Sequence, residues 1–282
     1  MTHDGDILVD IPSEDWPELA VLYEKHQEEA PYVYCAIKTA IRWNEQGVKK
    51  FTFTSPNNCW REDGTIFVFI QFQYLDLLIY TLTGSHDDIY EGLKRTKRIK
   101  PGTSVQIYSL HYSLFPTVRN FVKDSKKTLI FDIPGTTYAL TVEQSLHLDT
   151  RCPTGLIVKR LNSQHVNQIN NTWPHKYENS EAYISEVIKL NDCFGLFLEE
   201  TDELVAWALT HHMGILGIIH TEEQHRKKGY ASIITKHLSK EIARLNLRPA
   251  GNVIVGNMPS ESMFEKNGFQ DVGKCTYIKF IY

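Results

Sequence analysis

The sequence predicts a mixed α/β protein built in two halves. In both halves, short apolar runs of strand length alternate with segments whose apolar residues recur every three or four positions, which is the helical period. The clearest unit lies in the second half. There the small apolar run 214–221 is followed by a basic turn and by a helix in which Ile234, Leu238 and Ile242 share one face. A length of 282 residues suffices for two domains, and we expect 1–150 and 151–282 to be those domains.

Composition excludes several classes of function. The net charge is −4, with 42% hydrophobic and 23% charged residues, which is typical of a globular protein and not of a nucleic-acid-binding one. The five cysteines are scattered and form no C-x-x-C pair, so we expect no metal site and a reducing, cytoplasmic compartment. The most apolar run, 65–82, is broken by Gln71, Gln73 and Asp76, and the first 29 residues resemble no leader, so we expect no membrane partner. The oligomeric state stays open.

The first half reads as alternating helices and strands without a chemical motif. The segment 94–100 carries five basic residues; a solvated helix end is the favoured interpretation, and a phosphate-binding or nuclear-import patch is the alternative. Helical periodicity and turn residues predict helices over 13–23, 32–46, 87–99 and 117–124, and strands over 50–54, 66–73, 75–83, 105–110, 128–133 and 137–142.

The second half has a more specific order of elements. A helix follows the basic turn, and a short helix near 257–266 leads into the final segment, which we expect to be a hairpin of strands 270–273 and 276–281. The same rules predict strands over 156–160, 193–199, 204–210 and 252–255, and helices over 164–171 and 180–190.

Two motifs in this half resemble those of one superfamily. The pattern Arg226-x-x-Gly229-x-Ala231 resembles the pyrophosphate-binding signature of the GCN5-related N-acyltransferases (GNAT), and a second signature is met from Asn257 to Phe269. The resemblance extends over about 130 residues, because the order of elements is also that of the GNAT fold. It implies a mixed central sheet flanked by helices, with a degenerate GNAT-like domain as one interpretation of the N-terminal α/β half.

A finer resemblance narrows the expected activity. The run Val205-Ala-Trp207-Ala-Leu209 and the Asn171-Thr-Trp173 turn are similar to the glycine N-acyltransferase-like family. The resemblance implies an enzyme that transfers an acyl group from acyl-coenzyme A directly to the amine of a small molecule, such as an amino acid like glycine. Two alternatives stay open: a non-catalytic acyl-CoA-binding scaffold, and a protein or peptide N-acetyltransferase.

The resemblance also assigns roles to residues. Coenzyme A is the expected cosubstrate, and a small amine the expected partner. The aromatic loop between the first two helices would shape the acceptor pocket through Trp173, His175 and Tyr177, although packing explains such a loop equally well. The residues expected to hold coenzyme A are Ile219, His220, Thr221, Arg226, Lys227, Lys228, Gly229, Tyr230, Ala231, Ser232, Asn257 and Phe264.

Two positions depart from the family pattern. The last helix usually provides a Tyr as general acid, and this chain has Phe264 there; the family's proposed base is a Glu, and this chain has Ile215. His220, at the end of the central strand, is the nearest titratable replacement, and an imidazole titrates close to neutral pH. Strand alternation puts His220 and Ile215 on opposite faces unless the strand carries a bulge. A structural histidine is the alternative interpretation.

Overall fold

A computed structural model describes residues 5–83 and 86–282. Within them the chain forms two compact units. The first unit comprises the chain up to Thr137, and it also includes the short segment Ile254–Gly256 and the C-terminal segment Val272–Tyr282. The second unit comprises Tyr138–Val253 and Asn257–Asp271.

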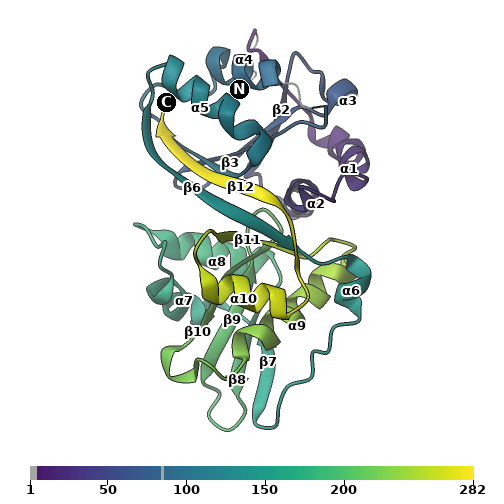
Figure 1. The fold of residues 1–282 in the computed structure, drawn as a ribbon, viewed down its shortest axis with the longest axis vertical. Coiled ribbons are helices and arrows are strands. Elements are labelled where there is room, and N and C mark those ends of the chain that lie inside the picture. The colour runs from purple at the N-terminus through teal and green to yellow at the C-terminus, as the bar shows by residue number, and fades with distance from the viewer. Residues whose placement is uncertain (1–4, 84–85) are drawn as a thin grey trace. The chain divides into compact units, whose positions relative to one another are not determined.

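The first unit is a sheet covered by helices. Its strands are hydrogen-bonded in the order β1-β2-β3-β4-β5-β12-β6, with β4 and β5 parallel and with β5 antiparallel to β12. Helices α4 and α5 lie side by side (Figure 1) and pack together. Their apolar side chains share a core with fully buried side chains of β5 and of the C-terminal strand β12. The elements are β1 (Leu8–Asp10), α1 (Trp16–Glu24), α2 (Pro31–Glu45), β2 (Phe51–Pro56), α3 (Trp60–Asp63), β3 (Ile66–Gln71), β4 (Leu75–Tyr80), α4 (His86–Arg95), β5 (Ser104–His111), α5 (Phe115–Asp124) and β6 (Thr128–Ala139).

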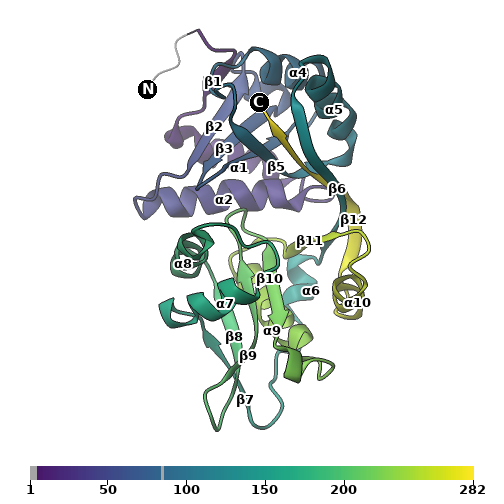
Figure 2. The ribbon, with the colours of Figure 1, turned by 90° about the vertical axis from the view of Figure 1, so that its left-hand side faces the viewer.

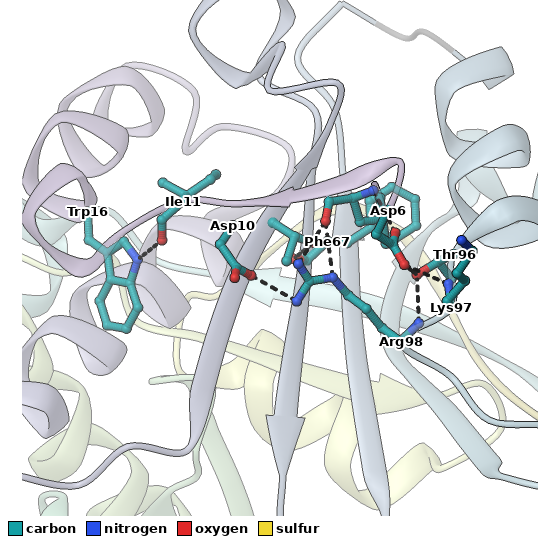
Figure 3. A network of polar contacts seen from close by, with 10 residues as sticks. Asp6, Asp10, Ile11, Trp16, Phe67, Thr96, Lys97 and Arg98 are labelled. Carbon is teal, nitrogen blue, oxygen red and sulfur yellow. Dashed lines mark hydrogen bonds and ion pairs between the residues drawn. The ribbon is translucent and has the colours of Figure 1, made fainter. Parts of the chain in front are cut away.

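The basic segment after α4 belongs partly to this fold. The Arg98 side chain is only 8% exposed, and its guanidinium donates to the carbonyl oxygen of Leu8 and pairs with Asp10 at 2.8 Å (Figure 3). Asp6 accepts a hydrogen bond from the Lys97 backbone at 2.6 Å and ties the same two segments together. The expectation of a solvated helix end is therefore wrong for Arg98, which fastens the edge strand β1.

The second unit contains a mixed five-strand arrangement in the order β11-β10-β9-β8-β7. Strands β7 to β10 are antiparallel, and β10 and β11 are parallel. Every residue of β9 is buried, as expected of a central strand with a continuous apolar sequence. The elements are α6 (Val142–Leu146), β7 (Leu156–Arg160), α7 (Val166–Thr172), α8 (Ser180–Leu190), β8 (Cys193–Leu198), β9 (Leu204–Thr210), β10 (Leu216–Thr221), α9 (Tyr230–Arg244), β11 (Ala250–Ile254) and α10 (Met258–Lys266). Strand β12 (Gln270–Ile281) follows, and from Val272 on it belongs to the first unit.

Helices α7 and α8 lie over one face of these strands, with α9 packed along β8, β9 and β10 (Figure 2). The connection between β10 and α9 is short, and it contains one turn of 3-10 helix, Glu223–His225. The strand, basic turn and helix predicted from the sequence are therefore confirmed.

Two predictions about strands are wrong in the same way. The segments 128–133 and 137–142 were expected as separate strands, but β6 runs unbroken through Pro134 and Gly135. The expected C-terminal hairpin is likewise one strand, β12, which passes through Gly273. In both cases the residues that read as a turn lie next to the point where the strand passes from one unit to the other.

Candidate functional site

The central strand β10 contains a β-bulge. Gly217 pairs with Leu209 and His220 pairs with Trp207, so three steps along β10 match two steps along β9. The extra residue places Ile218 at φ 50°, a conformation that a β-branched residue rarely adopts. Since paired residues share a face and Leu209 and Trp207 are two positions apart, the bulge returns His220 to the face of Gly217 and therefore of position 215.

Beyond the first residue of β10, the neighbouring strand separates from it. The parallel strands β10 and β11 pair only at Leu216 and Gly251. From Gly217 to the end of β10, the edge that faces β11 thus has no ladder partner within the described part of the chain. A strand edge without a partner exposes backbone donors and acceptors to whatever lies in the opening.

The loop after β10 leads into an uncapped helix N-terminus. Gly229 is the N-cap residue of α9, with φ 80°, and the helix begins at Tyr230. Among the described residues no side chain caps this helix and no acidic residue lies in its first turn. Nor does any described atom lie within 4 Å of where a Cβ of Gly229 would sit. Free N–H groups beside open space, at the positive end of a 15-residue helix, fit a phosphate group.

The cations expected beside this loop are available to a ligand. Lys227 and Lys228 are exposed, and Lys227 has a positive φ of 63°. Arg226 is exposed too, and its Nε donates to the Thr221 carbonyl oxygen at 3.3 Å. The Tyr230 ring stacks on that of His225, with 6.1 Å between ring centroids, and Lys228 Nζ lies 5.9 Å from the Tyr230 ring centroid.

The first residues of α9 are joined to the end of α10. Ser232 donates a hydrogen bond from its hydroxyl to the side-chain oxygen of Asn267, and Ala231 beside it is half-buried. The α9 N-terminus is thereby held in place from the side of α10. Ser232 can therefore offer a ligand its backbone more readily than its hydroxyl.

His220 lies half-buried at the bulge. Its ring stacks on the Trp207 indole, with 4.7 Å between ring centroids. Burial lowers the pKa of His220, the carboxylate of Glu222 raises it, and the positive charge of Arg226 lowers it. The net direction is downward, so the imidazole is neutral at neutral pH and can accept a proton.

Glu222 was not predicted from the sequence as a site residue, although it lies two positions after His220. Its Oε2 is 4.0 Å from His220 Nε2, and its Oε1 accepts a hydrogen bond from Gln168 Nε2 at 2.7 Å. Gln168, on α7, also donates to the Leu204 carbonyl oxygen at 3.1 Å. Helix α7 therefore holds the carboxylate that faces the imidazole. A carboxylate close to a histidine in the chain was the available sequence signal.

Of the three residues predicted in the aromatic loop after α7, only Trp173 lies beside His220. Trp173 lines a small pocket together with Ile219 and His220. His175 is exposed and does not line that pocket. Tyr177 does not line the pocket either, although its ring lies 6.1 Å from that of Trp173, measured between centroids. Trp207 forms another wall of the pocket. The sequence did not indicate it as a site residue, because it lies opposite His220 only through the strand pairing at the bulge.

The positions at which the family pattern is broken are both buried. Phe264 is 3% exposed and packs against the rings of Tyr138 and Phe269 and against Gly251, so it acts as a core side chain. Ile215 is fully buried. Neither can donate or accept a proton.

Asn257 is the N-cap residue of α10. Its side-chain oxygen accepts a hydrogen bond from the Ser260 backbone at 3.4 Å and caps α10. Gly256 before it has φ 89° and is exposed. The segment therefore leaves room beside the backbone but offers no further charge.

His211 and His212 lie just before β10, and both are buried, at 5% and 2% exposed. His211 Nδ1 accepts a hydrogen bond from the Met213 backbone at 3.1 Å, and Tyr183 Oη lies 3.0 Å from His212 Nδ1. Burial lowers the pKa of both imidazoles, that of His211 to about 3. They support the turn into β10.

Two further properties bear on the class of site. In the described ranges 5–83 and 86–282, no group of three or more His, Cys, Asp and Glu side chains could hold a metal ion. Nor does any helix of that part of the chain have the length and apolarity needed to cross a membrane.

Comparisons with known proteins agree with this geometry. Residues 193–278 match the model of the family described as FR47-like protein, and residues 7–121 match a domain of unknown function, DUF5645. The comparison with curated proteins finds no match.

Several solved structures resemble the chain over nearly its whole length. An X-ray structure of a Drosophila protein has a TM-score of 0.89 at 19% identity and covers 98% of this chain and 99% of its own. A GCN5-related N-acetyltransferase from Sphaerobacter thermophilus has a TM-score of 0.57 at 11% identity, covering 100% and 97%. A tandem GNAT protein from the clavulanic acid pathway has a TM-score of 0.53 at 8% identity, covering 96% and 97%.

At these identities the likeness shows the fold and not the activity. The similarity to a tandem protein extends over both halves, including the first, where the sequence alone contains no GNAT motif. The predicted fold class is confirmed: the chain is a mixed α/β protein with the GNAT fold, made of two GNAT-like halves, the second of which contains an FR47-like region.

Proposed function

We propose that the protein is an acyl-CoA-dependent N-acyltransferase that acts on the amine of a small molecule, and that its second half carries the reaction. The observation that supports this most is the sequence of features along β10. A bulged strand separates from its neighbour and leads directly into an open glycine loop and an uncapped helix N-terminus. The finer resemblance to the glycine N-acyltransferase-like family favours an amino acid such as glycine as acceptor.

Coenzyme A fits the residues at this place. The backbone N–H groups at the start of α9 would hold the diphosphate, with Arg226, Lys227 and Lys228 as counter-charges. The unpaired edge of β10, from Gly217 to Thr221, would hold the pantetheine amides by main-chain hydrogen bonds. The open space at Gly229 is where the phosphates would approach the backbone.

The reaction needs a polarised thioester carbonyl and a free amine. Backbone N–H groups at the bulge, near Ile219, would stabilise negative charge on the carbonyl oxygen as the amine nitrogen attacks the carbon. The C–N bond forms, the C–S bond breaks, and coenzyme A leaves as the thiolate. A thiol of pKa about 8.5 needs little help to leave, which makes a Phe at the position of the family's acid tolerable.

The amine must lose its proton before or during attack. His220 is neutral at neutral pH and lies at the bulge, so we assign it the role of base. The proton passes from the acceptor's ammonium group to the imidazole and from there to solvent. Trp173 is the residue of the aromatic loop that we place beside the reacting groups.

A non-catalytic acyl-CoA-binding protein is the second candidate. It is favoured by the burial of Phe264 and Ile215, which leaves both family positions without a proton donor or acceptor. The two candidates differ in turnover and not in binding.

The test measures both properties on the full chain. Calorimetry with coenzyme A should show binding, and release of free thiol from acetyl-CoA in the presence of pooled amino acids should show turnover. Binding without turnover supports the second candidate. If the protein shows neither binding nor turnover, both candidates are refuted.

A substitution in the loop makes the binding assay specific. Gly229→Trp should abolish coenzyme A binding, because the indole fills the phosphate space. Gly155→Trp is the matched control, since Gly155 has φ 84° and equally open surroundings among the described atoms of the same unit. Unchanged affinity in a folded Gly229→Trp protein would exclude this loop as the phosphate site.

A further inference from the structure

The phosphate loop of the proposed function comprises residues 226–229, between the 3-10 turn and α9. The chain enters this region along β9, because the Glu222 N–H, one residue beyond β10, donates to the Val205 carbonyl oxygen at 2.9 Å. The 3-10 turn Glu223–His225 follows directly and leads into the loop. How this turn is held therefore decides how the loop is presented to a ligand.

Glu203 holds the turn through two neighbouring side chains. It lies on the hairpin between β8 and β9, one residue before β9 begins. Its Oε1 accepts a hydrogen bond from Gln224 Nε2 at 3.3 Å and lies 3.3 Å from His225 Nε2. Because a carboxylate oxygen only accepts, the second contact requires the hydrogen of a neutral imidazole to be on Nε2. One carboxylate oxygen thus fastens two successive residues of the turn to the hairpin.

The turn also contacts α9. The His225 side chain is only 11% exposed. Its ring stacks on that of Tyr230, the first residue of α9, with 6.1 Å between ring centroids and 22° between the planes. The two residues flank the phosphate loop in the chain, so their contact closes the base of the loop. Glu203 joins this base to the hairpin, and the four exposed residues of the loop extend from it.

The backbone of the phosphate loop depends on such support. Lys227 has φ 63° and Gly229 has φ 80°, so both are left-handed. A residue other than glycine keeps this conformation where the surrounding structure imposes it. Turns of this kind direct successive backbone N–H groups to one side, which forms a concave site for an anion. A loop that has this shape before binding loses less conformational freedom when the ligand arrives.

The charge of Glu203 acts against the same ligand. Its side chain is 44% exposed, and it is an anion close to the loop that would hold the phosphates. Like charges repel, although solvent and salt screen the interaction of an exposed group. The hydrogen bonds of Glu203 and its charge therefore influence binding in opposite directions, and two substitutions can separate them.

We infer that Glu203 is a positioning residue for coenzyme A: it acts through Gln224 and His225, holds the phosphate loop in the shape that accepts a diphosphate, and opposes binding by its own charge. The inference rests on the proposed function, because it takes residues 226–229 as the place of the diphosphate.

Calorimetry with coenzyme A on the full chain separates position from charge. Glu203→Ala removes the acceptor, so the affinity should fall about tenfold as the loop gains freedom. Glu203→Gln removes the charge but keeps an oxygen that accepts from both side chains, so the affinity should equal that of the wild type or exceed it up to about threefold. Glu200→Ala is the matched control, because Glu200 is an exposed carboxylate of the same hairpin. Equal effects of the two Glu203 substitutions, or an equal loss in the control, would overturn the inference.

Trypsin digestion of the ligand-free full chain tests the anchoring without coenzyme A. Trypsin cleaves after Arg and Lys, which the loop carries at Arg226, Lys227 and Lys228, and a loop that is held in place must open before it is cut. Glu203→Ala should accelerate cleavage at these residues about fivefold or more, while Glu203→Gln and the control keep the wild-type rate. An unchanged rate in Glu203→Ala would overturn the inference. Failure of the proposed function looks different: the wild type then does not bind coenzyme A, while the cleavage pattern still identifies Glu203 as the anchor of the loop.

Discussion

His220 works as a neutral imidazole in the proposed reaction, so the loss of its side chain should be measurable directly. His220→Ala should lower kcat by roughly 10²-fold or more, because a positioned base contributes about 10²–10⁴-fold. The loss should shrink at high pH, where the acceptor is already deprotonated. The pH profile of thiol release measures both effects, and wild-type kcat with an unshifted profile would remove His220 from the mechanism.

Glu222 should act on the reaction through His220. Its charge raises the pKa of the imidazole 4.0 Å away, so Glu222→Gln should lower that pKa further, while the amide oxygen can still accept from Gln168. The low-pH limb of kcat should then move to lower pH. NMR titration of the His220 ring checks the shift without substrate, and an unmoved titration would show that Glu222 has no influence on the base.

The buried histidine His211 predicts a loss of stability in acid. Its pKa is about 3 when folded and near 6.5 when unfolded, so below pH 6.5 the unfolded chain binds more protons and folding weakens until pH falls to about 3. Protonation also removes the lone pair that accepts from the Met213 backbone. By pH 5 the cost is about 2 kcal/mol.

Denaturant unfolding at pH 7 and pH 5 measures this cost. His211→Gln should lose about 2 kcal/mol less between the two values than the wild type. Asp76, whose pKa burial raises to about 7, titrates in the opposite sense, so the difference between the two proteins is the informative quantity. An equal loss in both would contradict the assignment.

At the residue scale, motif and position indicated some of the residues that the structure places around β10. They pointed to His220, to the glycine loop and to Trp173, which the structure places around β10. They could not indicate Trp207 or Gln168, because those residues meet His220 and Glu222 only through strand pairing and helix packing. Nor could the sequence indicate that the side chains of His211 and His212 are both buried.

At the element scale, the bulge of β10 is the feature with the clearest stability cost. Ile218 is held at φ 50°, a conformation that costs of order 1–3 kcal/mol and persists where the surrounding structure imposes it. Strain of this kind clusters at ligand sites, which agrees with the proposed role of the bulge in polarising a carbonyl.

Deleting Ile218 should separate this function from stability. The ladder would become regular with His220 still opposite Trp207, so thermal stability should stay equal or rise, while acyl transfer should fall about 10²–10³-fold through loss of the oxyanion donor. Ile218→Gly keeps the extra residue and should lose less. Full activity in the deletion variant would show that the bulge has no part in the reaction.

Sequence patterns predicted most helices and strands, because each is defined by its own periodicity. They failed at β6 and β12, because turn-forming residues lie within each continuous strand: Pro134 and Gly135 in β6, and Gly273 in β12. The context that keeps these strands intact is pairing with residues far along the chain. One example is the ladder between β12 and β5, which joins Phe280 to Val105.

At the scale of the whole molecule, chain order and structural units do not coincide. After forming most of the second unit, the chain enters the first unit again, and Val272–Tyr282, eleven residues, belong to the sheet of that first unit. Tyr282 donates from its hydroxyl to the Leu93 carbonyl oxygen at 2.7 Å, and Ile278 and Phe280 are fully buried in that unit's core. A single cut near residue 150 would therefore leave β12 without β5.

A substitution in β12 should reveal this exchange. Phe280→Ala should destabilise the first unit by about 3–5 kcal/mol, because it removes a fully buried ring that contacts Phe121 of α5. Hydrogen exchange should then lose protection in β5, at Ser104–His111, while β9 of the second unit keeps its own. Tyr277→Phe on the same strand, a change of one hydroxyl on a half-buried ring, is the milder control. If protection falls in β9 and not in β5, the C-terminal strand belongs energetically to the unit that precedes it in the chain.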